Sequence, residues 1–258
     1  TSHRLDSDYE IDLPAILDAV VEEDDIEPFK YFYLFFRQEA FLPDQNDDCF
    51  LDDVYNQSNV FAEELGEDLQ ENIYEAIRVL AEGFIDTNEE LDEENLDLIH
   101  DSSLIYLYRL IFVLYAESEG RNLLPTNNDI YSSSYSLNQL KLEVVNNRNE
   151  TQQHYQAWQT DLWDQLDELF VLIDKGSKGN GIPKDDLYIP AYNGGLFRTN
   201  PDEDDTDESQ FLSNHEVGDV YIAEVIELLT RHEASEGDGK VFVDYSSLDE
   251  RNLGSIYE

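Results

Sequence analysis

Residues Leu104–Ala116 (LIYLYRLIFVLYA) form the longest apolar stretch of the chain, 13 residues interrupted only by Arg109. A helix that is apolar on every side is covered by its neighbours, so this stretch predicts the central helix of a helical protein. A membrane span needs roughly 20 apolar residues, and we therefore expect no membrane partner.

The position of Arg109 inside this stretch predicts a structural role. A guanidinium buried in an apolar helix needs a compensating partner. Glu117 lies eight residues further on, on roughly the same helix face. We expect Arg109 and Glu117 to form a structural ion pair, and the alternative is that Arg109 clamps backbone carbonyls.

Helical spacing recurs on both sides of the central stretch. Apolar residues repeat at steps of three and four, or cover the whole segment, in residues 28–41, 69–84, 158–173 and 217–229. Gly176 is placed to close the helix that begins near Trp158. A short strand is expected only at residues 240–244. The sequence therefore predicts a mainly α fold, a multi-helix bundle with irregular loops and little strand.

The domain organisation follows from these patterns. We expect an N-terminal extension over residues 1–27 and a helical domain over residues 28–258, either as one body or as two lobes divided near residues 122–134. The chain starts at Thr1 and contains no Met, which predicts a piece of a longer protein. A single cysteine, Cys49, excludes an internal disulfide, and no signal peptide opens the chain, so a cytoplasmic protein is expected.

The chain is strongly acidic, with 60 Asp and Glu against 15 Lys and Arg and a net charge of -45. Its 41% of hydrophobic residues and 12% of aromatic residues nevertheless predict a folded protein. Scarce lysine and carboxylates spread over the whole chain favour a halophilic protein, because the Debye length falls to about 3 Å at 1 M salt. The alternative is a stand-alone acidic interaction protein such as a DNA mimic, which would concentrate its carboxylates on one face.

Motifs of known catalytic chemistry are missing from the sequence. The glycines of residues 176–181 follow a helix, whereas a phosphate-binding loop follows a strand. A metal-dependent nuclease is a further hypothesis. It requires the side chains of Asp219, Asp238 and Lys240 to converge within a few ångströms. An Asp-Gly-Lys fragment is more typical of a turn. We therefore predict no catalytic residue, no metal site and no cofactor within this chain.

Six phrases resemble one family when they are taken in order. They are FFRQEAF (35–41), NIYEAIRVLAEGF (72–84), YRLIFVLYAE (108–117), NLLP (122–125), YNGGLF (192–197) and VDYSSLDERNLGSIYE (243–258). Together they resemble the helical region that precedes the methyltransferase domain in large adenine-specific DNA methyltransferases. The type IIG restriction-modification enzymes are the most similar group, and the phage-exclusion methyltransferases are relatives.

The resemblance implies a non-catalytic helical connector from a restriction-modification or phage-defence enzyme. Such a connector positions DNA and the adjoining methyltransferase domain, which is expected beyond residue 258. The resemblance also implies S-adenosylmethionine as the cofactor of the parent enzyme, with Mg²⁺ where an endonuclease is present. The catalytic tetrapeptide of the family contains two adjacent prolines, and this chain has no adjacent pair.

The YNGGLF phrase contains the loop that we single out as a contact site. Asn193, Gly194 and Gly195 are expected to form a tight turn with positive φ that places Phe197 against the core. Contact of this loop with DNA or with the methyltransferase domain is the functional alternative.

Two arginines beside the matching phrases, Arg121 and Arg198, are the cations most directly expected to contact DNA. The sequence leaves open which other cations converge with them. The remaining candidates are Arg37, Arg78, Lys141, Arg148, Lys175, Lys178 and Lys184.

Overall fold

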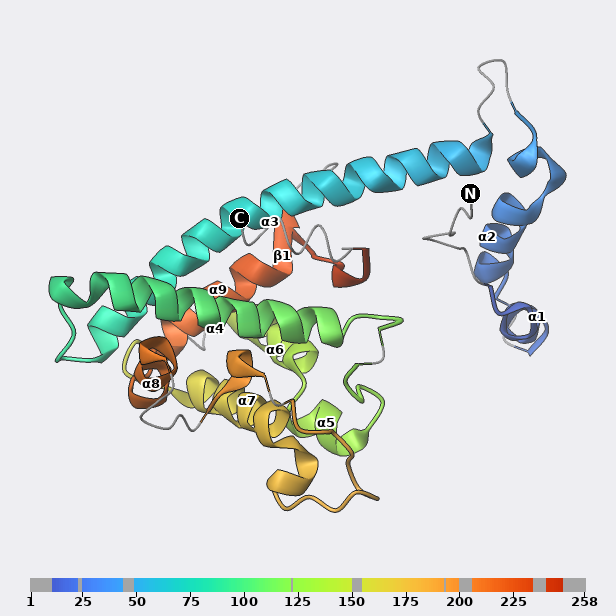
Figure 1. Ribbon diagram of the computed structural model, residues 1–258. Helices are drawn as coiled ribbons and strands as arrows, with labels where there is room; N and C mark the ends of the chain where they lie inside the picture. The colour runs from blue at the N-terminus through green and yellow to red at the C-terminus, as the bar shows by residue number, and fades with distance from the viewer. Residues whose placement is uncertain are drawn as a thin grey trace, which may run out of the picture. The chain divides into compact units, whose positions relative to one another are not determined.

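The structure is a computed structural model that describes residues 11–22, 25–43, 49–121, 123–149, 155–192, 194–199, 206–233 and 240–247 (Figure 1). Within these residues the chain forms nine α-helices, four short 3-10 helices and one two-stranded sheet. The predicted mainly α fold with little strand is confirmed. The last part of the final matching phrase, residues 248–258, lies outside the described residues.

The chain divides into two compact units, Thr1–Glu63 and Glu64–Glu258. The boundary falls inside helix α3 (Phe50–Thr87), which is 38 residues long. It therefore lies neither at residue 27 nor near residues 122–134, and the latter segment belongs to the second unit.

The first unit contains α1 (Leu13–Glu22), α2 (Glu27–Phe36) and the 3-10 helix η1 (Gln38–Phe41). Pro28 stands in the first turn of α2, where its missing N–H costs no hydrogen bond. Neither α1 nor α2 has a buried residue, and Tyr31 is 63% exposed. The expectation of a covered helix over residues 28–41 is therefore wrong for α2, because the other described elements of this unit leave its apolar side chains open.

Helix α4 (Leu96–Ala116) is the central helix of the second unit, as predicted (Figure 1). Eleven of its 21 residues are buried, among them Leu107, Leu110 and Ile111. The ring of Tyr106 stacks on Trp163 with 4.5 Å between centroids. Besides α7, the elements packed against α4 include α6 (Leu137–Asn149), α8 (Asp207–Asn214) and the 3-10 helices η2 (Glu93–Asn95), η3 (Gly195–Phe197) and η4 (Tyr245–Ser247).

Helix α7 (Asp161–Gly179) departs from the predicted bounds at both ends. It begins at Asp161, and Trp158 lies before it with 78% of its surface exposed. The helical backbone that begins at Asp161 breaks at Gly176, as predicted, because its φ of 68° and ψ of 167° are non-helical, and one further turn runs to Gly179. This turn and the segment after it form the candidate site described below.

The remaining elements complete the second unit. Helix α5 (Asp129–Ser134) precedes α6, and α9 (Asp219–Thr230) packs against α6 and α7. Strand β1 (Arg231–Glu233) continues from α9 and pairs antiparallel with β2 (Lys240–Phe242). Of the predicted strand at residues 240–244, the first three residues are in the sheet.

One helical segment of the described chain, Glu93–Ala116, has the length and apolar composition that a membrane span would need. However, 56% of its most apolar window is buried inside the protein. A buried central helix has the same composition, so this property is weak evidence for a membrane.

Candidate nucleic-acid interface

Arg109 projects from α4 and holds the backbone around η3. Its Nε donates to the carbonyl of Leu196 at 2.6 Å and its Nη2 donates to the carbonyl of Arg198 at 3.0 Å. The guanidinium also lies 5.5 Å from the centroid of the Phe170 ring. Burial lowers the pKa of Arg109. The carbonyl clamp that was the alternative prediction for Arg109 is therefore what the structure contains.

Glu117 has different partners, and they lie at the start of α6. Its carboxylate accepts from the Tyr131 hydroxyl at 2.7 Å, from Ser136 Oγ at 3.1 Å, and from the backbone N–H groups of Leu137 and Asn138 at 2.9 and 2.8 Å. A carboxylate is favourable at a helix N-terminus because unpaired N–H groups and the helix dipole are located there. Glu117 thus caps α6 from outside that helix.

The predicted ion pair between Arg109 and Glu117 is wrong. Both residues are described, and no ion pair within 4 Å joins them. Eight residues of helix rise about 12 Å, which is too far for a direct contact unless both side chains bend toward each other. Because α4 ends at Ala116, Glu117 instead turns toward α6.

We expect Arg109→Ala to lower the free energy of unfolding by about 2–3 kcal/mol, since it leaves two part-buried carbonyls without their donor. Chemical denaturation in molar salt would measure the change. Arg78→Ala is a suitable control, because Arg78 is exposed and bonded to Glu75 and Glu82 on its own helix. Equal unfolding midpoints for the Arg109 variant and the unmodified protein would refute the clamp.

The loop predicted to have positive φ is only partly described. Asn193 lies outside the described residues. Gly194 has φ -97° and ψ 151°, and Gly195 begins η3. Among the described glycines, φ is positive at Gly120, Gly176 and Gly181. The predicted conformation is therefore wrong for Gly194 and Gly195, because the chain turns here through a 3-10 helix.

The expectation that this loop places Phe197 against the core is confirmed. Phe197 is fully buried. Its ring contacts those of Phe112 and Tyr192 edge to face, with centroid distances of 5.3 and 5.7 Å. The loop is thus fixed from the α4 side by Arg109 and from within by Phe197.

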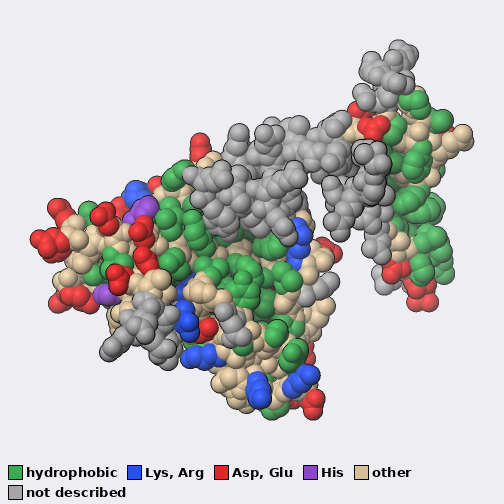
Figure 2. All heavy atoms as spheres, viewed as in Figure 1, with side chains coloured by type: hydrophobic (Ala, Val, Ile, Leu, Met, Phe, Trp, Pro, Cys, Tyr) green, Lys and Arg blue, Asp and Glu red, His purple; other side chains and the backbone are tan. Residues whose placement is uncertain are grey.

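Four exposed cations lie around the C-terminal end of α7: Lys175, Lys178, Lys184 and Arg198. We call these four residues the α7-end patch. Hydrogen bonds bring their segments together, because Ser177 donates to the Ile189 carbonyl at 2.9 Å and Asp174 accepts from the N–H of Thr199 at 3.3 Å. Figure 2 shows blue side chains gathered over the lower part of the second unit, whereas many of the red ones lie where α3 turns into α4.

The α7-end patch is locally basic in a very acidic chain. Residues 174–198 contain the four cations of the patch and three carboxylates, a surplus of one positive charge, while the whole chain has a net charge of -45. Two exposed aromatic rings accompany the cations. Tyr188 is 57% exposed and Tyr192 is 43% exposed. Lys184 Nζ lies 4.6 Å from the centroid of the Tyr188 ring.

Three other cations proposed from the sequence contact protein groups outside the α7-end patch. Arg121 donates to the Ser246 carbonyl at 3.3 Å and lies over the Tyr115 ring, so it fastens η4 to the end of α4. Arg37, in the first unit, lies 5.7 Å from the centroid of the Phe50 ring. Arg78 is bonded within α3. Arg121 and Arg198 therefore have different neighbours in the structure, Ser246 and Tyr115 for the first and Arg109 for the second.

Asp219, proposed for a nuclease centre, joins α9 to the start of α7. It is 3% exposed, and its Oδ1 accepts from the N–H of Leu162 at 2.8 Å. Burial raises the pKa of Asp219. Asp238 lies outside the described residues, and Lys240 lies 3.5 Å from Glu227. Within the described residues no three His, Cys, Asp or Glu side chains are grouped to hold a metal ion.

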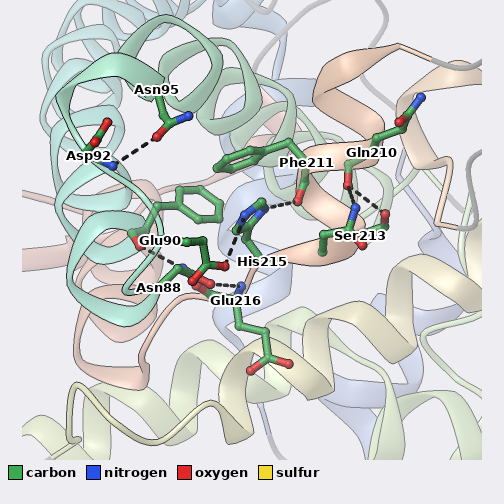
Figure 3. Close-up of polar contacts among 11 residues, drawn as sticks. Asn88, Glu90, Asp92, Asn95, Gln210, Phe211, Ser213, His215 and Glu216 are labelled. Atoms are coloured by element: carbon green, nitrogen blue, oxygen red, sulfur yellow. Dashed lines mark hydrogen bonds and ion pairs between the residues drawn. The ribbon is translucent and has the colours of Figure 1, made fainter.

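A second polar cluster fastens α8 to the turn between α3 and α4 (Figure 3). His215 Nδ1 bonds the Phe211 carbonyl at 2.8 Å, and its ring stacks on that of Phe211. Its Nε2 points to Glu90 at 3.7 Å. Asn88 donates to the Glu216 carbonyl at 2.8 Å. With both ring nitrogens directed to protein groups, His215 acts as a structural residue.

Comparison of the chain with family models, with curated proteins and with solved structures finds no match. The resemblance to the methyltransferase connectors therefore stays a prediction.

Proposed function

We propose that this chain is a non-catalytic helical connector of a DNA-modifying enzyme and that its α7-end patch contacts the DNA backbone. The proposal takes its class from the six ordered phrases. Under it, methyl transfer from S-adenosylmethionine belongs to an adjoining domain, and this chain positions the DNA and that domain.

The observation that carries the proposal is the local charge of the α7-end patch. Lys and Arg side chains neutralise phosphates, and they must be concentrated on one surface to do so. Here four cations occur with three carboxylates in a chain that has four carboxylates for every cation. The exposed rings of Tyr188 and Tyr192 add surfaces on which bases can stack.

The clamp at Arg109 gives this patch a fixed geometry. It holds the carbonyl of Arg198 itself, while Phe197 anchors the preceding residue in the core. A cation on a rigid loop loses less entropy on binding than one on an open loop. The predicted contact loop and the basic end of α7 therefore form one surface.

We expect combined Lys175→Gln, Lys178→Gln and Lys184→Gln substitutions to weaken DNA binding by at least about tenfold and to reduce the slope of log K against log salt by about 2–3. The slope falls because a phosphate that is no longer contacted keeps its counterions when the protein binds. Fluorescence anisotropy with a labelled duplex, titrated with salt, measures both quantities. Arg78→Gln is the matched control, because Arg78 is exposed and already bonded to two carboxylates.

An unchanged salt slope in the triple variant would exclude the α7-end patch as the contact surface. The class of function is tested separately with the purified chain in 2–3 M salt, roughly the range in which surface charges are fully screened. The chain should fold there and should neither cleave nor methylate DNA. Methyl transfer by this chain alone would contradict a connector role.

A further inference from the structure

A second group of cations converges on one carboxylate, away from the residues of the α7-end patch. Glu227 on α9 lies 3.0 Å from Arg148 Nη1 at the end of α6, 3.7 Å from Arg231 Nη1 on β1 and 3.5 Å from Lys240 Nζ on β2. The Glu227 side chain is 18% exposed. We call Arg148, Glu227, Arg231 and Lys240 the Glu227 cluster.

In the Glu227 cluster cations outnumber carboxylates, whereas in the whole chain carboxylates outnumber cations. Three cations face one carboxylate, and among the described residues no other Asp or Glu lies within 4 Å of any of the three. By contrast, Arg78 has two carboxylates and Lys30 has one. Among the described residues the cluster therefore has a surplus of about two positive charges, and repulsion between these cations favours a further anion beside them.

A fourth cation, Lys141, lies near the Glu227 cluster, over the ring of Phe242. Lys141 Nζ lies 5.2 Å from the ring centroid and Arg231 Cζ lies 5.9 Å from it. Burial lowers the pKa of Lys141, while the carboxylates of Glu117 and Asp244 act in the opposite direction.

One N–H group of the Arg231 guanidinium has no hydrogen-bond acceptor. Its Nη2 donates to the carbonyl of Lys240 at 2.8 Å. Its Nε is buried and has no hydrogen-bond partner. A buried guanidinium N–H without an acceptor is costly, and an oxyanion would supply one.

We propose that the Glu227 cluster binds a phosphate group. A phosphate monoester or inorganic phosphate has a charge of about -1.5 to -2 near neutral pH, which matches the surplus of the cluster. Its oxygens accept from guanidinium N–H groups in pairs, as carboxylates do. The group is either free phosphate or the terminal phosphate monoester of a nucleic acid, because both present the same oxygens and the same charge. The proposal does not depend on the α7-end patch.

The test is isothermal titration calorimetry of the purified chain with potassium phosphate at constant ionic strength, chloride replacing phosphate. We expect saturable binding that Lys240→Gln and Arg148→Gln each weaken by about tenfold, the loss of one charge-assisted contact. Glu227→Gln should instead tighten phosphate binding, because it removes the competing carboxylate and keeps the side-chain shape. Arg78→Gln is the matched control and should bind as the unmodified protein does.

Opposite effects of the Glu227 and Lys240 substitutions distinguish a binding site from a stabilising cluster, since loss of folding would weaken binding in both variants. Circular dichroism establishes that each variant is folded. A 5′-phosphorylated oligonucleotide and its unphosphorylated form are titrated in parallel to identify the source of the phosphate. Absence of saturable binding of phosphate and of both oligonucleotides, or equal affinities in the unmodified protein and the Lys240 variant, would overturn the proposal.

Discussion

Replacement of Glu117 by alanine is expected to lower the free energy of unfolding by about 4 kcal/mol, from about 1–3 kcal/mol for each buried group left unpaired. The carboxylate serves four donors: the hydroxyls of Tyr131 and Ser136 and the N–H groups of Leu137 and Asn138. Glu117 is 6% exposed, so water cannot readily replace it. Guanidinium denaturation at fixed ionic strength, followed by circular dichroism, measures the loss.

Glu119→Ala is the control for this substitution, because Glu119 is exposed two residues further on. It should change stability by less than about 0.5 kcal/mol, as most surface substitutions do. Glu117→Gln should lie between the two, since an amide keeps one acceptor oxygen but replaces the other with a donor. A Glu117→Ala loss no larger than that of Glu119→Ala would mean that α6 does not depend on this cap.

Replacement of Gly176 by alanine is expected to destabilise the protein by about 3–5 kcal/mol through two added effects, backbone strain and overpacking. The conformation of Gly176, φ 68° and ψ 167°, is open almost only to glycine. A Cβ atom there would also lie 2.6 Å from the backbone N of Ala191 and 2.7 Å from the carbonyl oxygen of Ile189. Differential scanning calorimetry at constant salt would measure the loss.

Gly181→Ala separates these two effects. Gly181 also has positive φ, 74°, but no atom lies within 4 Å of the position that a Cβ would take. Strain alone should cost about 1–2 kcal/mol there. If Gly176→Ala cost no more than Gly181→Ala, close packing of α7 against residues 189–191 would not contribute to stability.

The sequence predicts the fold class well and burial less well. Leu104–Ala116 and residues 28–41 have the same all-round apolar pattern, yet the first is central and α2 has no buried residue. An all-round apolar pattern indicates that a helix is compatible with a buried position. It does not indicate whether other elements of the fold pack around that helix. The glycine signal at Gly176 correctly predicts the break in the helical backbone, but it does not predict the further turn that runs to Gly179.

The candidate sites depend on contacts between distant parts of the chain. Arg109 was identified as needing a partner, but its carbonyls come from residues 87 and 89 positions further on. The α7-end patch could have been found from a charge count along residues 175–198. The Glu227 cluster has no such signal, because Arg148, Glu227 and Lys240 meet only when α6, α9 and β2 pack together.

The two tryptophans have opposite environments, which gives the protein an intrinsic optical probe of its core. Trp163 is 6% exposed and stacked on Tyr106, whereas Trp158 is 78% exposed. An indole in an apolar site emits at shorter wavelength than one in water, and a dissolved quencher reaches only the latter. Fluorescence of Trp163, isolated by Trp158→Phe, therefore follows the packing between α4 and α7 directly as the salt concentration is changed.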